Sequence, residues 1–358
     1  MVHICCSVDS HFFLQQLRAE YPNENIIGFF YNPNIHPYSE YKLRLSDVKY
    51  SCEKLGIKLI EGNYDLNAWL KATKGLEKEP EKGERCTICF DKRLEVTAQQ
   101  ALKLKIKLFT TTLLMSPLKS QEKLKTIGNI LATQHNLNFI FKDYRKGQGA
   151  YLQSSIVKSN NIYRQNYCGC LYALKTQRDS QNKICDELMS QIGQQILPNS
   201  IESRIDLYKK RDLYESKKQQ YKIVKDKFLN YRLLGGRVMI DKNVVPSYFV
   251  CYSGLTNNYV KGKILHCTNN IYYLNKNEAK LITLDLFNDL NNTNYQNTTE
   301  LIYDPLLFKK EVLFRNKILQ SIYDLSCLVV LDIIPLETQN IEIFCNSKIY
   351  LDVKENVV

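Results

Sequence analysis

The feature that most constrains the fold is a regular alternation of strand-like and helix-like segments between residues 2 and 141. The strand-like segments are short apolar runs at residues 2–5, 25–31, 57–61, 108–113 and 138–141. The longer segments repeat apolar residues at helical spacing, at residues 11–20, 38–55, 92–105 and 121–135. Such alternation is typical of βαβ units. It predicts an α/β fold, in which helices cover both faces of a parallel sheet.

Polar and thiol side chains gather where two of these predicted strands end. Cys5, Cys6 and Asp9 follow the first strand, and residues 110–116 (TTTLLMS) end a later one. In parallel sheets, binding sites form beyond the carboxyl ends of the strands. We therefore expect the functional site at this edge of the sheet.

The 12 cysteines fall into three close pairs and six singletons. The sequence starts with MVHICC and shows no secretory signal, so we expect a cytoplasmic protein. No apolar run approaches the roughly 18–20 residues of a membrane helix, and no membrane partner is expected. In a reducing compartment, paired cysteines bind metals or carry out redox chemistry more often than they form structural disulfides. Packing as small buried side chains is the role predicted for the singletons, which are Cys52, Cys185, Cys251, Cys267, Cys327 and Cys345.

The first pair, Cys5 and Cys6, occupies the turn where nucleotide-binding folds carry glycines. Two thiols at this turn disfavour phosphate binding and favour a soft metal. Asp9 has two interpretations that the sequence leaves open. It is either a helix N-terminal cap worth about 1 kcal/mol or an oxygen ligand beside the sulfurs.

Two further pairs complete the thiol set. Cys86 and Cys89 form a C-x-x-C motif directly before a predicted helix, and Cys168 and Cys170 form a C-x-C motif around a glycine. Together with the first pair, the C-x-x-C motif provides four thiolates, which suit either zinc or an iron–sulfur cluster. The C-x-C motif can form a strained disulfide or bind one metal.

Five motifs follow one another in the first 170 residues. They are CC-x-x-D at 5–9, RC-x-x-C-x-x-x-RL at 85–94, TTTL-x-x-SP-x-K at 110–119, DYRK at 143–146 and YRQ-x-YCGC at 163–170. In this order they resemble the cobalamin-independent epoxyqueuosine reductases, the QueH family. The resemblance covers residues 1 to about 180, which is half of the chain.

The resemblance implies a Rossmann-like fold related to the PP-loop (HUP-like) ATPases. It also implies an oxidoreductase that converts epoxyqueuosine at the tRNA wobble position to queuosine, the last step of queuosine-tRNA biosynthesis. Its partners would be that tRNA and an electron donor that the sequence does not identify. A 4Fe–4S cluster would be held by Cys5, Cys6, Cys86 and Cys89. The C-x-C motif (Cys168 and Cys170) would be a redox pair or, with Asp9, would hold an additional mononuclear iron.

The charge of the chain favours a polyanionic partner, because 49 Lys and Arg face 37 Asp and Glu, a net charge of +12. Recognition of single-stranded RNA combines basic side chains with aromatic stacking. The candidates for phosphate contacts are Lys119, Arg145, Lys146 and Arg164, and the candidates for stacking are Tyr163 and Tyr167.

Two alternative functions were weighed against this one. An ATP-dependent tRNA-modifying enzyme of the PP-loop type would carry S-G-G-x-D-S at the first turn, where this chain has Cys5 and Cys6. A zinc-stapled RNA-binding module without catalysis would need a second local C-x-x-C, and the C-x-C motif would have no role in it.

The sequence predicts three regions: a catalytic iron–sulfur domain at 1–185, a basic helical segment at 186–235, and an accessory domain of unknown role at 236–358. In the basic segment, Tyr221, Val224, Phe228 and Tyr231 have helical spacing, which predicts one or two amphipathic helices. The accessory region alternates β-rich runs with Asn-rich turns, which predicts a small mixed α+β domain.

Overall fold

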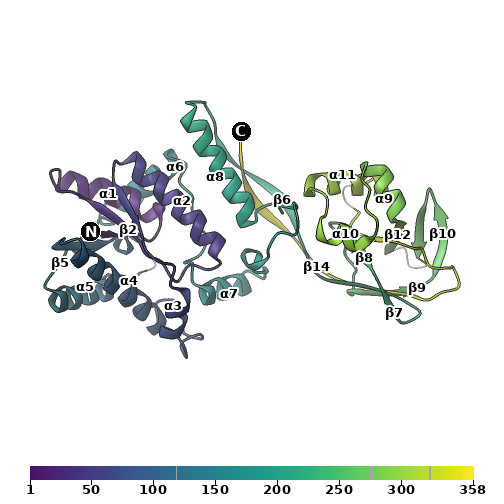
Figure 1. The fold of residues 1–358 in the computed structure, drawn as a ribbon, viewed down its shortest axis with the longest axis horizontal. Helices are drawn as coiled ribbons and strands as arrows, with labels where there is room; N and C mark the ends of the chain where they lie inside the picture. The colour runs from purple at the N-terminus through teal and green to yellow at the C-terminus, as the bar shows by residue number, and fades with distance from the viewer. Residues whose placement is uncertain (118, 275–277, 322–323) are drawn as a thin grey trace. The chain divides into compact units, whose positions relative to one another are not determined.

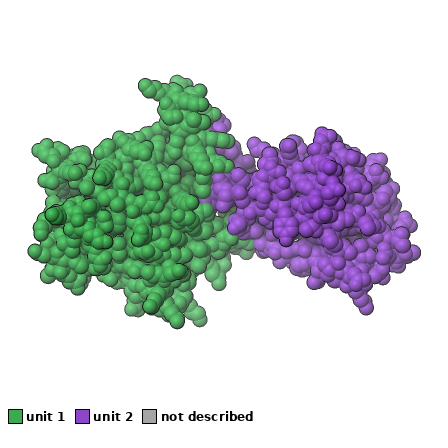
Figure 2. Space-filling view, viewed as in Figure 1, with its two compact units in different colours: residues 1–188, 205–223 green, residues 189–204, 224–358 purple. Residues whose placement is uncertain are grey.

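The computed structural model describes residues 1–117, 119–274, 278–321 and 324–358. The chain forms two compact units, which have different colours in Figure 2. Unit 1 contains residues 1–188 and 205–223, and unit 2 contains residues 189–204 and 224–358. The segment predicted as a separate helical region, 186–235, is divided between them. Within the described ranges, no helix is both long and apolar enough to cross a membrane.

Unit 1 is built on a parallel sheet with the strand order β3-β2-β1-β4-β5. The strands are β1 (Val2–His3), β2 (Ile27–Phe30), β3 (Lys58–Glu61), β4 (Leu108–Thr111) and β5 (Asn138–Phe139). The central strand β1 places Val2 in register with Gly28 of β2 and with Thr110 of β4. The strand order reverses at β1, and such a switch point opens a crevice beyond the carboxyl ends of the strands.

Helices cover both faces of this sheet (Figure 1). On one face α1 (Ser7–Glu20) packs against α2 (Tyr38–Lys54), and on the other α4 (Glu84–Lys103) packs against α5 (Gln121–His135). The shorter helices are α3 (Leu66–Ala72), α6 (Gly149–Ser159) and α7 (Leu171–Ser180). The core between the layers contains fully buried Ile4, Phe13, Leu94, Phe109 and Leu114. The predicted Rossmann-like sheet with helices on both faces is confirmed.

The structure moves the start of one predicted helix. Helix α4 begins at Glu84 rather than at residue 92, so Cys86 and Cys89 lie in its first two turns. Side chains three positions apart lie on the same face of a helix. The C-x-x-C motif is therefore held by regular structure and not by the loop before it.

A strand replaces a predicted helix beyond residue 222. Helix α8 (Ile201–Ser216) confirms the first part of the basic segment, but Ile223–Ile240 forms the strand β6. Its neighbours in the sheet are β7 (Asn243–Val245) and β14 (Ile341–Val357). The helical prediction for this stretch is wrong, because pairing with a strand more than 100 residues later outweighs a local spacing of aromatic residues.

Unit 2 contains two sheets. The first has the order β10-β11-β12-β13-β8, and the second has the order β7-β6-β14-β9. The further strands are β8 (Ser247–Phe249), β9 (Tyr259–Gly262), β10 (Ile264–Thr268), β11 (Ile271–Leu274), β12 (Ala279–Thr283) and β13 (Cys327–Leu331). Between the parallel strands β12 and β13 the chain forms α9 (Leu284–Asn291), α10 (Thr298–Tyr303) and α11 (Phe308–Leu319). The predicted β-rich runs lie in this unit, but the sequence did not reveal its three helices.

Candidate active site

The turn after β1 is fixed by the ends of the neighbouring strands. The backbone N–H of Cys5 donates to Thr112 Oγ1 at 3.1 Å, just beyond β4. From the other side, Asn32 Nδ2 donates to the carbonyl oxygen of Ile4 at 2.8 Å. Cys6 is extended, with φ of −167°, and α1 begins at the next residue. The two thiols therefore lie at the switch point of the sheet.

Asp9 joins the two thiols in one group. The ligand atoms of Cys5, Cys6 and Asp9 all lie within 4.8 Å of one another. Cys5 Sγ lies 3.7 Å from Cys6 Sγ and donates to Asp9 Oδ2 at 3.4 Å. Gln153 Nε2 donates to the other carboxylate oxygen at 3.1 Å. Asp9 lies in the first turn of α1, and the hydrogen bonds to its carboxylate come from side chains, those of Cys5 and Gln153.

Burial sets the protonation of this group. The hydrogen bond to Cys5, together with burial and the nearby carboxylate, raises the pKa of the Cys6 thiol well above its ordinary value. Burial also raises the pKa of Asp9, although hydrogen bonds from both thiols and Gln153 oppose it. Without a cation, this arrangement favours the protonated form of the Cys6 thiol, and a bound metal ion would reverse that preference.

The C-x-x-C motif lies against the C-x-C motif. Cys89 is buried with Trp69 and Cys170, and Cys168 packs against this cluster. Cys86 is less buried and accepts a hydrogen bond from the backbone N–H of Lys82 at 3.3 Å. Burial raises the pKa of Cys89. In the described part of the chain, the C-x-x-C cysteines do not come within single-ion range of the first pair.

The C-x-C loop depends on its glycine and on a buried arginine. Gly169 has φ of +103°, and a Cβ there would lie 3.0 Å from Ile35 and 3.1 Å from Arg44. The Arg44 guanidinium donates to the carbonyl oxygens of Tyr167 (3.0 Å) and Cys168 (3.2 Å). A side chain at this position would be strained and would displace the arginine.

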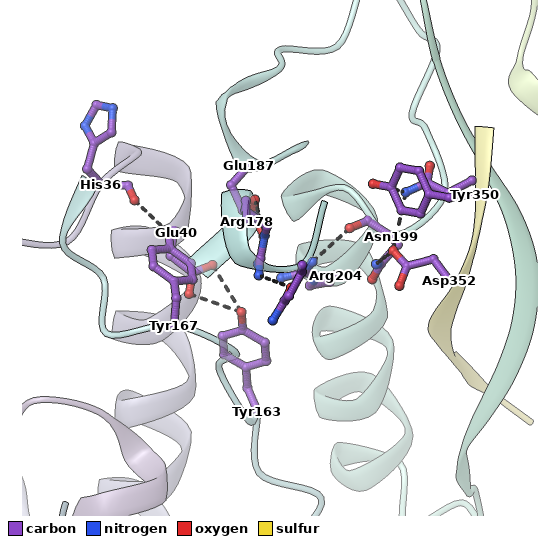
Figure 3. A network of polar contacts seen from close by, with 12 residues as sticks. His36, Glu40, Tyr163, Tyr167, Arg178, Glu187, Asn199, Arg204, Tyr350 and Asp352 are labelled. Atoms are coloured by element: carbon purple, nitrogen blue, oxygen red, sulfur yellow. Dashed lines mark hydrogen bonds and ion pairs between the residues drawn. The ribbon is translucent and has the colours of Figure 1, made fainter. Parts of the chain in front are cut away.

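The two tyrosines of the YRQ-x-YCGC motif are buried and make hydrogen bonds within the protein. The Tyr163 hydroxyl donates to both carboxylate oxygens of Glu40 at 3.1 Å, and the Tyr167 hydroxyl donates to the carbonyl oxygen of His36 at 2.6 Å (Figure 3). Their exposed fractions are 3% and 4%. Both side chains are thus held by the protein, although Tyr167 also lines the pocket described below. Stacking of Tyr163 and Tyr167 on RNA bases stays a prediction.

Two buried cations lie beside the thiols. Lys119 Nζ donates to Cys168 Sγ at 3.3 Å and pairs with Glu81 at 3.5 Å. Arg93, which is 3% exposed, donates through Nε to the Cys89 carbonyl oxygen at 3.1 Å. Burial alone would raise the pKa of Cys168, but Lys119 and Arg93 outweigh it and lower that pKa. Lys119 thus faces a thiol in the wall of the pocket, and its contact with anticodon phosphate stays a prediction.

A pocket of about 410 Å³ joins these elements. Its lining includes Cys5, Cys6, Asp9 and Cys168, and the two arginines Arg145 and Arg164 also line it. Arg145 is half-buried and donates to Asp143 and to the Ser116 carbonyl oxygen, whereas Arg164 and Lys146 are exposed. These three side chains remain candidates for phosphate contacts.

Sequence reasoning assigned no role to four residues of this pocket. They are Arg44, Arg93, Gln153 and Gln165, and the last donates to Cys6 Sγ at 3.0 Å. Arg93 and Gln165 lie inside the family motifs, but the sequence did not indicate what their side chains contact. Only the fold brings Arg44 and Gln153 to the thiols.

The prediction for the six single cysteines holds in part. Cys52, Cys251, Cys327 and Cys345 are buried as expected. Cys185 is only half-buried, and Cys267 on β10 is exposed, so the packing prediction is wrong for Cys267.

Comparisons with known proteins identify the family. A family model described as "Epoxyqueuosine reductase QueH" matches residues 1–176. The epoxyqueuosine reductase QueH of Helicobacter pylori is 40% identical over 329 residues, which cover 88% of this chain and 89% of the relative. The chain belongs to the epoxyqueuosine reductase QueH family.

Members of the QueH family differ in how much of this chain they match. The QueH protein of Acinetobacter baylyi is 39% identical over 177 residues, which cover 49% of this chain and 80% of that protein. The match to the Helicobacter relative is long enough to extend into unit 2. A solved "predicted subunit of tRNA methyltransferase" from Methanocaldococcus jannaschii aligns with a TM-score of 0.34 and 14% identity, over 53% of this chain and 92% of that one.

Proposed function

We propose that this chain reduces the epoxide of epoxyqueuosine in tRNA to the alkene of queuosine. Its relatives carry the name epoxyqueuosine reductase. The observation that carries the proposal is the group of Cys5, Cys6 and Asp9, which lies within 4.8 Å at the switch point and lines one pocket with Cys168. Converting an epoxide to an alkene consumes two electrons and two protons and releases the oxygen as water. Thiols and soft-metal centres suit such electron transfer.

Four thiols, of which Cys5 and Cys6 line the pocket, suit a 4Fe–4S cluster. The proposed ligands are the free thiols of Cys5, Cys6, Cys86 and Cys89. Lys119 and Arg93 place two positive charges beside the thiols, and a buried anionic centre requires such compensation. When bound, the cluster would supply electrons to the substrate.

The remaining donors divide into two roles. Burial raises the pKa of Cys170 to about 11, whereas the pKa of Cys168 is lowered by Lys119 and Arg93. This asymmetry supports a redox pair in which Cys168 is the more readily ionised thiol. Asp9 groups with the first thiol pair and not with the C-x-C motif, so as a metal ligand it would add an oxygen donor beside Cys5 and Cys6.

The basic residues near the pocket would bind the substrate RNA. Arg164 and Lys146 are exposed, and Arg145 lies beside them with its guanidinium fixed by Asp143. Phosphate contacts of this kind position a nucleic acid without reading its sequence. We therefore assign RNA binding to these three cations and the reaction to the thiols and Asp9.

The proposal is tested by counting iron in anaerobically prepared Asp9→Ala protein. We expect the iron content to fall by a fraction while the broad visible absorption of the cluster persists, and turnover of epoxyqueuosine-containing tRNA to be lost. Asp91→Ala, an exposed aspartate on α4, is the matched control and should retain both iron and turnover. Unchanged iron in Asp9→Ala would remove Asp9 from the ligand set.

The same preparation separates the alternative functions. A colourless wild-type protein with one bound zinc would support the zinc-stapled RNA-binding module. Saturable binding of ATP together with an absence of iron would support the PP-loop type of enzyme.

A further inference from the structure

Unit 2 encloses a cavity of about 310 Å³ that has no part in the proposed reaction. All of its lining residues belong to unit 2, and most come from β6, β8, α11 and the segment 189–197. Four aromatic rings line it: Tyr231, Tyr248, Phe249 and Phe308. Ligand pockets have volumes from about 300 Å³ upward, so this cavity suits a single ring system.

One of the lining residues, Tyr231, has a buried hydroxyl without a partner among the described residues. Tyr231 is 6% exposed, and its hydroxyl makes no hydrogen bond to the described residues. A buried polar group without a partner costs about 1–3 kcal/mol. A ligand that pairs with this hydroxyl would recover that free energy.

A buried carboxylate gives the cavity its polarity. Glu311 is 1% exposed, and it accepts hydrogen bonds from the backbone N–H of Cys251 at 2.7 Å and from Gln195 Nε2 at 2.5 Å. The lining contains no lysine, and its single arginine, Arg232, donates to the Asn230 amide oxygen and to the Pro198 carbonyl oxygen. An anionic ligand would meet an acidic side chain and no lysine in the described lining. A ligand with N–H donors is favoured instead.

We infer that this cavity binds a planar heteroaromatic ring that carries N–H donors, such as a nucleobase. The aromatic side chains would stack on the ring faces. Glu311 would accept an N–H group, and the Tyr231 hydroxyl would pair with a second polar atom of the ring.

Two sources could supply such a ring: a free nucleoside or an unpaired base of an RNA. Unit 2 carries 16 Lys and Arg against 15 Asp and Glu, which is 16 − 15 = +1 of the total of +12. Phosphate attraction is therefore concentrated on unit 1 and does not by itself bring RNA to this cavity.

The test is saturation-transfer NMR on the full-length protein with guanosine, adenosine, cytidine and uridine, each offered alone. We expect at least one nucleoside to bind, and Tyr231→Phe to weaken its affinity about 3- to 10-fold, as expected for the loss of one hydrogen bond. Benzoate, an anionic ring, should not bind. Tyr303→Phe is the matched control, because this tyrosine is 74% exposed in the same unit and its change should leave the affinity unaltered.

Short single-stranded oligonucleotides distinguish the two sources. Binding of an oligonucleotide that is weakened by Tyr231→Phe, with free nucleosides silent, would support an RNA base as the ligand. If neither the nucleosides nor the oligonucleotides bind at millimolar concentration, the inference is overturned. An affinity that Tyr231→Phe leaves unchanged would overturn it too. Neither result would affect the proposed reaction in unit 1, which is measured by iron content and turnover.

Discussion

The buried ion pair between Arg211 and Asp47 should control the stability of unit 1. Arg211 Nη1 lies 2.6 Å from Asp47 Oδ1, and both side chains are almost fully buried. Asp47 also accepts hydrogen bonds from Ser7 Oγ and from the backbone N–H of Tyr163. A residue of α8 thus supports both the helix that follows Cys6 and the start of the YRQ-x-YCGC segment. We therefore expect that removing the Arg211 guanidinium destabilises the active site, although Arg211 does not line the pocket.

The change is Arg211→Met, which keeps the length of the side chain and removes its charge. Breaking a buried pair by removing one partner costs about 3–5 kcal/mol. Asp47 keeps its two other donors, so we expect the lower end, about 3 kcal/mol. Burial raises the pKa of Asp47 and Arg211 opposes this, so the variant should regain stability as the pH falls and the carboxyl group protonates. The double variant Asp47→Asn/Arg211→Met should cost no more than either single one.

Fluorescence of the chain's one tryptophan during urea unfolding is the assay, because Trp69 is 1% exposed in unit 1. The control is Lys54→Met, which breaks a partly exposed pair with Glu215 between the same two helices, α2 and α8. This change should cost less than about 1 kcal/mol. Single-variant effects that add to within about 0.5 kcal/mol in the double variant would refute the reasoning.

Three further predictions concern the metal site, the RNA and unit 2. Serine at Cys86 should lower the iron content and bleach the visible absorption, whereas serine at the buried Cys52 should change neither; full iron in the Cys86→Ser protein would contradict the ligand assignment. Arg164→Glu should weaken tRNA binding, and wild-type affinity should fall steeply with salt because phosphate contacts release counterions; binding that ignores salt would argue against phosphate contacts. Burial raises the pKa of Glu311 from 4.5 to about 7, so the folded state holds a proton that the unfolded state releases. The contribution of Glu311 to stability should therefore be fully present below pH 4.5 and decline by on the order of 3 kcal/mol as the pH rises through 7. Thermal unfolding of Glu311→Gln should not show this decline, and parallel pH profiles would contradict the assignment.

Local sequence patterns predicted the parallel sheet and the thiols at its edge. The alternation of segments identified all five strands of unit 1, and α5 has the predicted bounds. The place of Cys5 and Cys6 followed from the rule that sites lie beyond strand ends. These features depend on residues that are close in the sequence, so a single sequence is enough to predict them.

The features that local patterns did not predict depend on contacts between distant residues. Lys119 was a candidate for phosphate contacts, and the structure places it against Cys168, 49 positions later. Tyr163 was a candidate for stacking on RNA bases, and the structure places its hydroxyl against Glu40, 123 positions earlier. Residue type alone does not show whether a tyrosine or a lysine turns inward, because burial is decided by the packing of remote segments.

The division of the chain into units has a consequence for its synthesis and for the design of truncated versions. The chain leaves unit 1 after residue 188, returns at residue 205 and leaves again after residue 223. A ribosome must therefore synthesise part of unit 2 before the last piece of unit 1, including Arg211, can reach Asp47. A fragment that stops at residue 185 would contain every proposed cluster ligand but would leave Asp47 without its ion-pair partner Arg211. Shortened versions of this protein should accordingly extend to residue 223.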